Sequence, residues 1–413
     1  MAVSKEFAPP FKLIAPFFVA GILFYLFFGI SSLFFDIDYE FMNVHVAGAV
    51  HLFLLGYVMM IIFGAMAQLV PVVLETGHFS VDLYYVIFPL LAAGAATMVI
   101  GFWFWPVAVG FGGLLVLISM LIFSTEVLLT IKKSTITSNT LKSVKIANIF
   151  LLIGIVSGFL LATTVSGIGW FDMDRLLKVH VYAVLGGYVM ITVMGISMIL
   201  LPMFGLSHGF DEKPFESALK IMTISVVAVI LGGLTNIDPL AQLGYIGSFA
   251  ATGIYLYQIF LIYKTRARKE NDIWFFSVLT AYISLAIALI CGFLYLLSAD
   301  YRPLLYGAVW LFFIGFLGFL INGHLFKIVP FLVWFHKYSD KVGKERVPML
   351  SEMYPKKSAY YQFGFSLAAA VLGFLALLGG SGSLFKAAAA FLFVGAVYMA
   401  LALKWMLKYP NEI

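Results

Sequence analysis

The sequence predicts an all-α integral membrane protein with about twelve transmembrane helices in a pseudo-threefold ring. Three observations predict this class. Of the 413 residues, 63% are apolar and only 11% are charged, apolar stretches of about 20 residues recur from end to end, and one set of landmarks repeats three times. A soluble domain carries about 25% charged residues, so this chain cannot cover a water-facing surface of its size. The lipid bilayer is therefore the expected partner.

The chain is expected to form a single transmembrane domain over residues 1–413. A loop of soluble character is expected only at about 334–357. The helices are expected at residues 11–35, 44–73, 82–103, 105–132, 142–166, 175–204, 215–235, 240–264, 273–297, 303–333, 358–380 and 385–408.

The charged residues predict the orientation of these helices. Basic clusters fall at the N-terminus and in the loops that follow even-numbered helices: Lys5, Lys12, Lys132, Lys133, Lys142, Lys145, Lys264, Arg266, Arg268, Lys269, Lys337, Lys341, Lys344, Arg346, Lys356 and Lys357. The opposite loops carry Asp36, Asp38, Glu40, Asp172, Asp174 and Asp300. The positive-inside rule then predicts that both termini are cytoplasmic. The expected location is a prokaryotic inner membrane. The net charge of +5 is explained by this topology, and no nucleic-acid partner is expected.

An internal repeat runs through the chain. A Gly-aromatic pair is followed by a proline in the second, sixth and tenth helices: Gly56-Tyr57 with Pro71, Gly187-Tyr188 with Pro202, and Gly315-Phe316 with Pro330. The glycines and the prolines recur at identical intervals, and His78, His208 and His336 keep the same intervals to within one position. The repeat units, about 11–132, 142–264 and 273–408, each hold four helices. Major-facilitator transporters repeat as six plus six helices, so the spacing argues against that class.

Histidines within membrane spans are candidate functional residues. His45 and His51 lie in the first turns of the second helix and His180 in the first turns of the sixth, near the predicted outer surface. Neutral imidazole is the commonest metal ligand, so His51 or His45 with His180 is expected to hold a heme iron from two sides. The alternative is that each histidine bonds a neighbouring carbonyl or lies at the headgroup boundary, which applies most to His45.

Other polar residues have weaker claims to a site. His324 corresponds in the repeat to residue 65, roughly 20 Å along the helix from His51, so it cannot bind the same iron. With Lys327 and Asn322 it is expected to line a polar cavity, to hold a second metal, or to have a structural role. Arg175 and Arg302 begin the sixth and tenth helices and are candidates for heme propionates, or are interfacial anchors. The methionines every four residues from Met190 to Met198 are expected to pack rather than to ligate.

The second helix resembles known proteins in detail. His51-Leu-Phe-Leu-Leu-Gly56-Tyr57, running to Val70-Pro71, is similar to the NnrS family, in which His-Glu-Met-Leu-Phe-Gly-Tyr also ends at Val-Pro. It also resembles the histidine-bearing helix of C-family oxidases in the heme-copper oxidase subunit I superfamily. The resemblance implies a twelve-helix fold whose second, sixth and tenth helices face the cofactors. It implies non-covalent heme b, since the one cysteine, Cys291, excludes attachment through Cys-x-x-Cys-His.

The chain lacks residues that form the oxygen-reducing centre in the oxidases it resembles. The tenth helix opens with Arg302-Pro-Leu-Leu-Tyr and lacks the His-x-His pair, the seventh lacks the His-His pair, and Val184 follows His180 at the place of a cross-linked tyrosine. A copper site is thus left without a full ligand set. The expected function is electron transfer, or binding and metabolism of nitric oxide or another small gas; an enzyme would be a heme-dependent oxidoreductase.

Two other roles stay open on the same scaffold. One is a transporter or channel for heme, metal or a small molecule. The other is a silent subunit beside a redox partner such as a cytochrome c or a quinol-oxidising protein, or a homo-oligomer.

Overall fold

A computed structural model describes residues 9–38, 43–298 and 301–409 of the chain. Over these residues the fold is all helical, and twelve helices are long and apolar enough to cross a membrane, which confirms the predicted all-α, multi-pass membrane class. The charged residues Lys5, Glu40 and Asp300, used for the predicted orientation, lie outside the described residues. The helices are α1 (Phe11–Ser32), α2 (Val44–His51), η2 (Leu52–Met59), α3 (Met60–Leu74), η3 (Val81–Leu83), α4 (Tyr84–Trp103), α5 (Val107–Lys133), α6 (Asn139–Val165), α7 (Met173–Val181), η4 (Tyr182–Met190), α8 (Ile191–Gly205), α9 (Lys213–Thr235), α10 (Asp238–Lys264), α11 (Ile273–Leu297), α12 (Arg302–Trp310), η5 (Leu311–Gly318), α13 (Phe319–Tyr338), η6 (Ser339–Lys341), η7 (Leu350–Glu352), α14 (Lys356–Gly379) and α15 (Gly382–Leu407).

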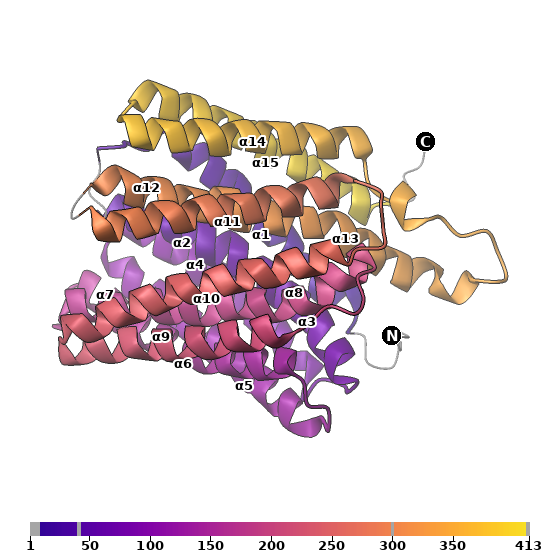
Figure 1. The fold of residues 1–413 in the computed structure, drawn as a ribbon, viewed down its shortest axis with the longest axis horizontal. Coiled ribbons are helices and arrows are strands. Elements are labelled where there is room, and N and C mark those ends of the chain that lie inside the picture. Colours follow the sequence, from indigo (N-terminus) through magenta and orange to yellow (C-terminus); the bar gives the residue numbers. More distant parts are fainter. Residues whose placement is uncertain (1–8, 39–42, 299–300, 410–413) are drawn as a thin grey trace. The chain divides into compact units, whose positions relative to one another are not determined.

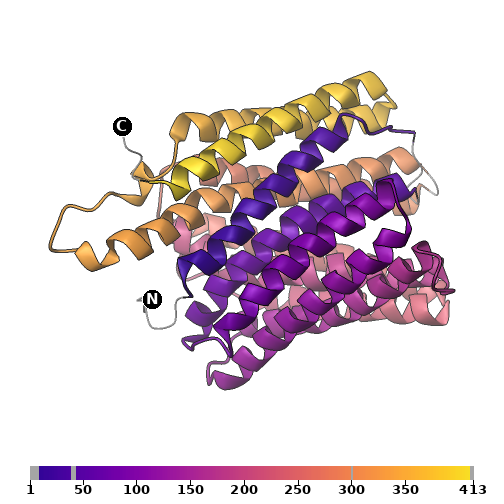
Figure 2. The same ribbon diagram turned by 180° about the vertical axis from the view of Figure 1, so that it is seen from behind.

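The chain forms two compact units. Among the described residues, the first unit holds residues 66–270 together with residue 9, and the second unit holds 10–38, 43–65, 271–298 and 301–409. The border lies within α3, because this helix begins in the second unit and ends in the first. In the first unit α4 packs along α5 and α9 along α10; in the second, α14 and α15 run side by side (Figures 1 and 2).

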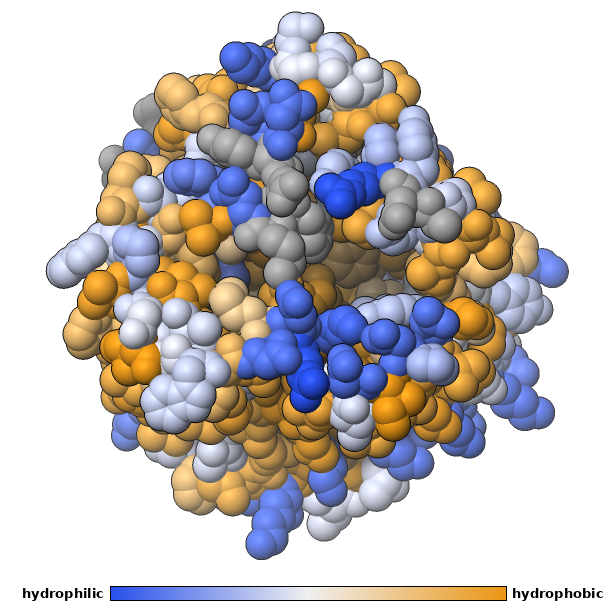
Figure 3. Space-filling view, turned by 90° about the vertical axis from the view of Figure 1, so that its left-hand side faces the viewer, coloured by the Kyte–Doolittle hydropathy of each residue, from blue (hydrophilic) through white to orange (hydrophobic). Residues whose placement is uncertain are grey.

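The surface has the polarity expected of a membrane protein. Figure 3 shows hydrophilic residues gathered where the helices end, with hydrophobic residues over the flanks. Large apolar side chains such as Phe111, Ile224 and Leu243 are more than 60% exposed on helix flanks. A soluble protein rarely exposes apolar surface on this scale, so lipid covers these flanks.

The tenth membrane helix is longer than expected. The sequence predicted its end at residue 333 and a loop from 334, but α13 continues to Tyr338 and η6 to Lys341. The extension stays helical because Phe335 is buried and the indole Nε1 of Trp334 donates a hydrogen bond to the carbonyl of Pro348, 3.1 Å away. The following loop is therefore folded back onto the helix.

The second, sixth and tenth membrane helices each change to π-helix near their middle. The π segments are η2, η4 and η5. Their last residues, Met59, Met190 and Gly318, are separated by the same two intervals as the glycine and proline landmarks. The repeat predicted from sequence is therefore present in the backbone. π segments inside α-helices are frequent at functional sites.

Each π segment contains the repeated glycine, where the preceding helix comes very close. A Cβ at Gly56 would lie 2.5 Å from the Phe24 ring, one at Gly187 2.5 Å from Phe150, and one at Gly315 2.6 Å from Ser284. Such distances are below van der Waals contact. The glycines are thus required for close helix packing, which stabilises helix association in membranes.

We expect Gly187→Ala to destabilise the protein by about 1–3 kcal/mol, because the added methyl overpacks against Phe150. The thermal unfolding midpoint in detergent measures this effect. Gly253→Ala in α10 is the control, because a Cβ there meets nothing within 4 Å and alanine favours a helix by about 0.5–1 kcal/mol. Equal midpoints for the two variants would contradict this account of the close packing.

Candidate functional site

His180 lies at the end of α7, in the first unit, with its ring against α6. Its Nδ1 donates a hydrogen bond to the carbonyl of Gly154, 2.8 Å away. The ring fits because α6 has a Gly-x-x-x-Gly stripe: a Cβ at Gly158 would lie 2.6 Å from the His180 ring, and one at Gly154 2.6 Å from Val184. Since Nδ1 carries the proton in this bond, the lone pair of the neutral ring is on Nε2, as a metal ligand requires.

His51 lies at the end of α2, in the second unit, directly before η2. Its Nδ1 donates to the carbonyl of Ala47 at 2.7 Å, so the neutral ring again has its lone pair on Nε2. His45 is exposed in the first turn of α2. The carbonyl bonds expected of a structural histidine are thus present at His51 and His180, and they also select the tautomer suited to ligation.

The two candidate propionate anchors, Arg175 and Arg302, are exposed. The Arg175 Nε lies 3.0 Å from the carboxylate of Asp172, which also caps α7 by accepting from the backbone N–H of Arg175. Arg302 is the first residue of α12. The contact of Arg175 favours the role of an interfacial anchor.

The polar residues of α13 go to separate partners, all in the second unit. His324 is buried, donates from Nδ1 to the carbonyl of Leu320 at 2.7 Å, and meets the Trp274 ring edge-on. Lys327 forms an ion pair with Asp272 at 2.5 Å. Asn322 is bonded to a tyrosine of η2. His324, Lys327 and Asn322 thus each contact a different residue. These contacts do not join the three side chains in the polar cavity that was one of the expected alternatives.

The repeated tyrosines of the π segments differ in their partners. The hydroxyl of Tyr57 donates to Asn322 Oδ1 at 2.8 Å, and its ring stacks on Tyr25, which is also hydrogen-bonded to Asn322 and Ser366. The equivalent hydroxyl of Tyr188 in η4 is buried and, among the described residues, has no hydrogen-bond partner. Phe316 is the third equivalent. An orphaned buried hydroxyl marks a place where water or a ligand group is expected.

Sequence reasoning missed a buried charge cluster in the first unit. Glu126 of α5 is fully buried, accepts from His78 Nδ1 at 2.8 Å and from the Tyr84 hydroxyl at 3.0 Å. The sequence did contain a signal for this cluster, because Glu126 is a carboxylate inside an apolar span. Such a charge is costly in a membrane unless a partner is close to it.

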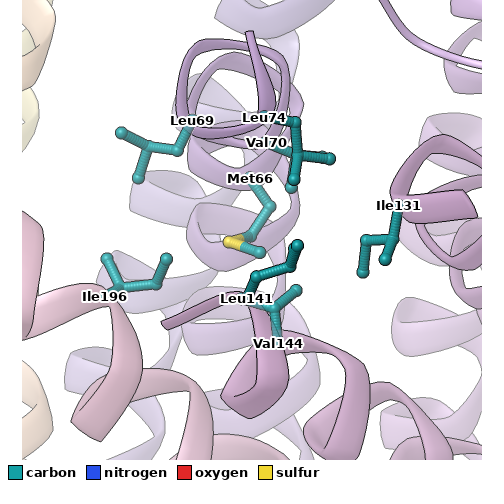
Figure 4. A pocket seen from close by; sticks show the side chains of 8 residues that line it. All are labelled: Met66, Leu69, Val70, Leu74, Ile131, Leu141, Val144 and Ile196. Carbon is teal, nitrogen blue, oxygen red and sulfur yellow. The ribbon is translucent and has the colours of Figure 1, made fainter. Parts of the chain in front are cut away.

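An apolar pocket lies near the end of α3 (Figure 4). Met66 points toward its centre in the view, and the other lining side chains are Leu69, Val70, Leu74, Ile131, Leu141, Val144 and Ile196. Every lining residue is apolar and none is a candidate ligand. The pocket therefore offers no hydrogen-bond donor or charge to a polar cofactor.

In the described part of the chain, no group of three or more His, Cys, Asp or Glu side chains is placed to hold a metal ion. A site with one or two histidine ligands, as for heme, needs no such group. No protein-family model matches the sequence, and no curated protein matches it. The membership of the heme-copper oxidase superfamily expected from the second helix therefore stays a prediction.

Removing the two repeated hydroxyls should have different effects. Tyr57→Phe removes a buried hydrogen bond and should destabilise the protein by about 1 kcal/mol. Tyr188→Phe removes an unsatisfied polar group and should leave the unfolding midpoint unchanged or raise it. Thermal unfolding of the two variants in one detergent tests this, and equal losses would show that Tyr188 has a partner.

The glycine stripe should control the imidazole of His180. Gly158→Ala places a methyl 2.6 Å from the ring carbon Cε1, so the ring must move and lose its bond to Gly154. We expect a shift of the His180 ring signals in nitrogen-15 NMR. Gly364→Ala, in α14 with nothing within 4 Å of the new Cβ, is the control and should leave these signals unchanged.

Proposed function

We propose that this chain is a heme b-binding membrane protein that acts in electron transfer, or in the binding and metabolism of nitric oxide or a related small gas. His180 and His51 are the residues that would hold the heme iron, with His45 as the second candidate on the same helix as His51. One observation carries the proposal. Both half-buried histidines, near-equivalent in the repeat and next to π segments, donate from Nδ1 to a helix carbonyl and so present Nε2 as the ligating atom.

Two further features of the first unit fit a bound group. The glycines at 154 and 158 leave space for the His180 imidazole, and a larger residue at 158 would occupy that space. The orphaned hydroxyl of Tyr188 is a buried donor on the helix segment that follows His180. A buried hydroxyl with no partner costs about 1–3 kcal/mol, which a polar ligand group or water would recover.

The number of protein ligands decides between the two roles. If both His180 and His51 hold the iron, the chemistry that heme would supply is electron transfer; if one of them does, it would be gas binding. In this chain the protein's part is to set the imidazole tautomer through the Ala47 and Gly154 carbonyls and to exclude water with the apolar residues around η2 and η4. A cytochrome c or quinol-oxidising protein is the expected class of redox partner.

The test is the visible spectrum of protein purified in mild detergent and supplied with heme. A b-type difference spectrum between reduced and oxidised protein is expected. A band that shifts on adding nitric oxide indicates an open face, and a band that does not move indicates two histidine ligands and electron transfer.

Variants assign the ligands. His180→Ala and His51→Ala should each lower heme content or change the spin state, and the double variant should abolish binding. His208→Ala is the matched control, because His208 is exposed in a loop. Full heme content in the folded double variant would overturn the proposal and leave transport of heme, metal or a small molecule as the function to test.

A further inference from the structure

The end of α3 is fastened by a histidine in place of a backbone bond. Pro71 has no N–H, so the carbonyl four residues earlier, that of Ala67, loses its helical donor. His78 Nε2 lies 2.7 Å from this carbonyl oxygen and donates to it. The imidazole therefore ties the loop after α3 back to the helix at the place where proline breaks the ladder.

The other ring nitrogen faces a carboxylate. His78 Nδ1 lies 2.8 Å from Glu126 Oε1, and both side chains are completely buried. Glu126 also accepts from Thr130 Oγ1 at 2.8 Å and from the Tyr84 hydroxyl at 3.0 Å. The ammonium group of Lys133 is also at this place: its Nζ donates to the backbone carbonyl of His78 at 3.1 Å and lies over the Phe79 ring.

The partners of the ring determine how many protons the pair holds. Both ring nitrogens face oxygen acceptors, and a neutral imidazole has only one N–H. Both hydrogen bonds of the ring can therefore form only if the His78–Glu126 pair holds one extra proton. The reference is a neutral imidazole next to an ionised carboxylate. With this proton on Nδ1, which donates it to Oε1 of Glu126, the pair is neutral overall. Without it, His78 loses one of its two bonds and a buried negative charge remains, which is strongly unfavourable.

The second repeat shows that the fold does not need a charge here. Phe215 and Gln258 occupy the places of Tyr84 and Glu126 one repeat later, in the same register to within one position. Gln258 is also fully buried, and its Oε1 accepts from the backbone N–H of Phe215 at 3.0 Å. A neutral amide thus fills the equivalent place within the same unit. The ionisable pair of the first repeat is a local addition that packing alone does not explain.

We propose that His78 and Glu126 form a proton-binding site, and that the bound proton fastens the end of α3 to α5. The bound species is a proton from the water at the predicted cytoplasmic end, and the N–H bond that it forms is the one covalent bond that changes when it binds. The proton cannot reach water while both side chains are completely buried. We therefore expect the proton to leave only when His78 separates from Glu126 and from the end of α3. This site is independent of heme binding.

Nitrogen-15 NMR of histidine-labelled full-length protein tests the protonation. At neutral pH both ring nitrogens of His78 should carry protons, and His78→Gln assigns the signals. In Glu126→Gln the His78 ring should have a single N–H. The matched control is Glu216→Gln, a carboxylate of the same unit that accepts from Asn139; it should leave the His78 signals unchanged.

Hydrogen exchange followed by mass spectrometry tests the fastening. At one pH the amides of residues 74–79 should exchange about tenfold faster in Glu126→Gln than in the wild-type protein, with α10 as internal reference. The proposal is overturned if wild-type His78 has a single N–H, if Glu126→Gln leaves the ring unchanged, or if Glu126→Gln removes the second His78 proton without speeding the exchange of residues 74–79.

Discussion

The structure depends on satisfying backbone hydrogen bonds where water is absent. In a bilayer an unpaired carbonyl or N–H is costly, and regular helices meet this demand by themselves. Exceptions therefore need side chains. Pro71 frees a carbonyl that the His78 imidazole takes up, and the hydroxyl of Tyr57 lies 3.5 Å from the carbonyl of Gly318 at the end of η5. Buried polar side chains therefore serve the backbone at these two irregular places.

The membrane helices could be predicted because a helix that crosses lipid must have a certain length and an apolar composition. Both properties can be read from each segment of the sequence without knowing how it packs. The repeat could be predicted because glycine and proline have backbone roles that keep them in register. The π segments could not, since a widened turn changes neither composition nor apolar length. The extension of α13 was missed because Lys337 reads as a loop residue, whereas the packing of Phe335 and the bond from Trp334 to Pro348 keep it helical.

The candidate site was predictable only as single residues. A histidine in an apolar span is visible in the sequence, so His51 and His180 were found, but their carbonyl partners depend on packing. For His180 the Gly154-x-x-x-Gly158 stripe was an available signal of close helix approach. Glu126 could not be paired with His78 from sequence, because 48 residues separate them and only the packing of α5 beside the end of α3 brings them together.

The shared place of η2, η4 and η5 shows that the repeat extends to the hydrogen-bonding pattern of the backbone as well as to residue type. The aromatic residue of the repeat is tyrosine in η2 and η4 and phenylalanine in η5. The widened turn therefore does not depend on a hydroxyl at this place, and the three helices share a backbone shape on which different polar groups are mounted.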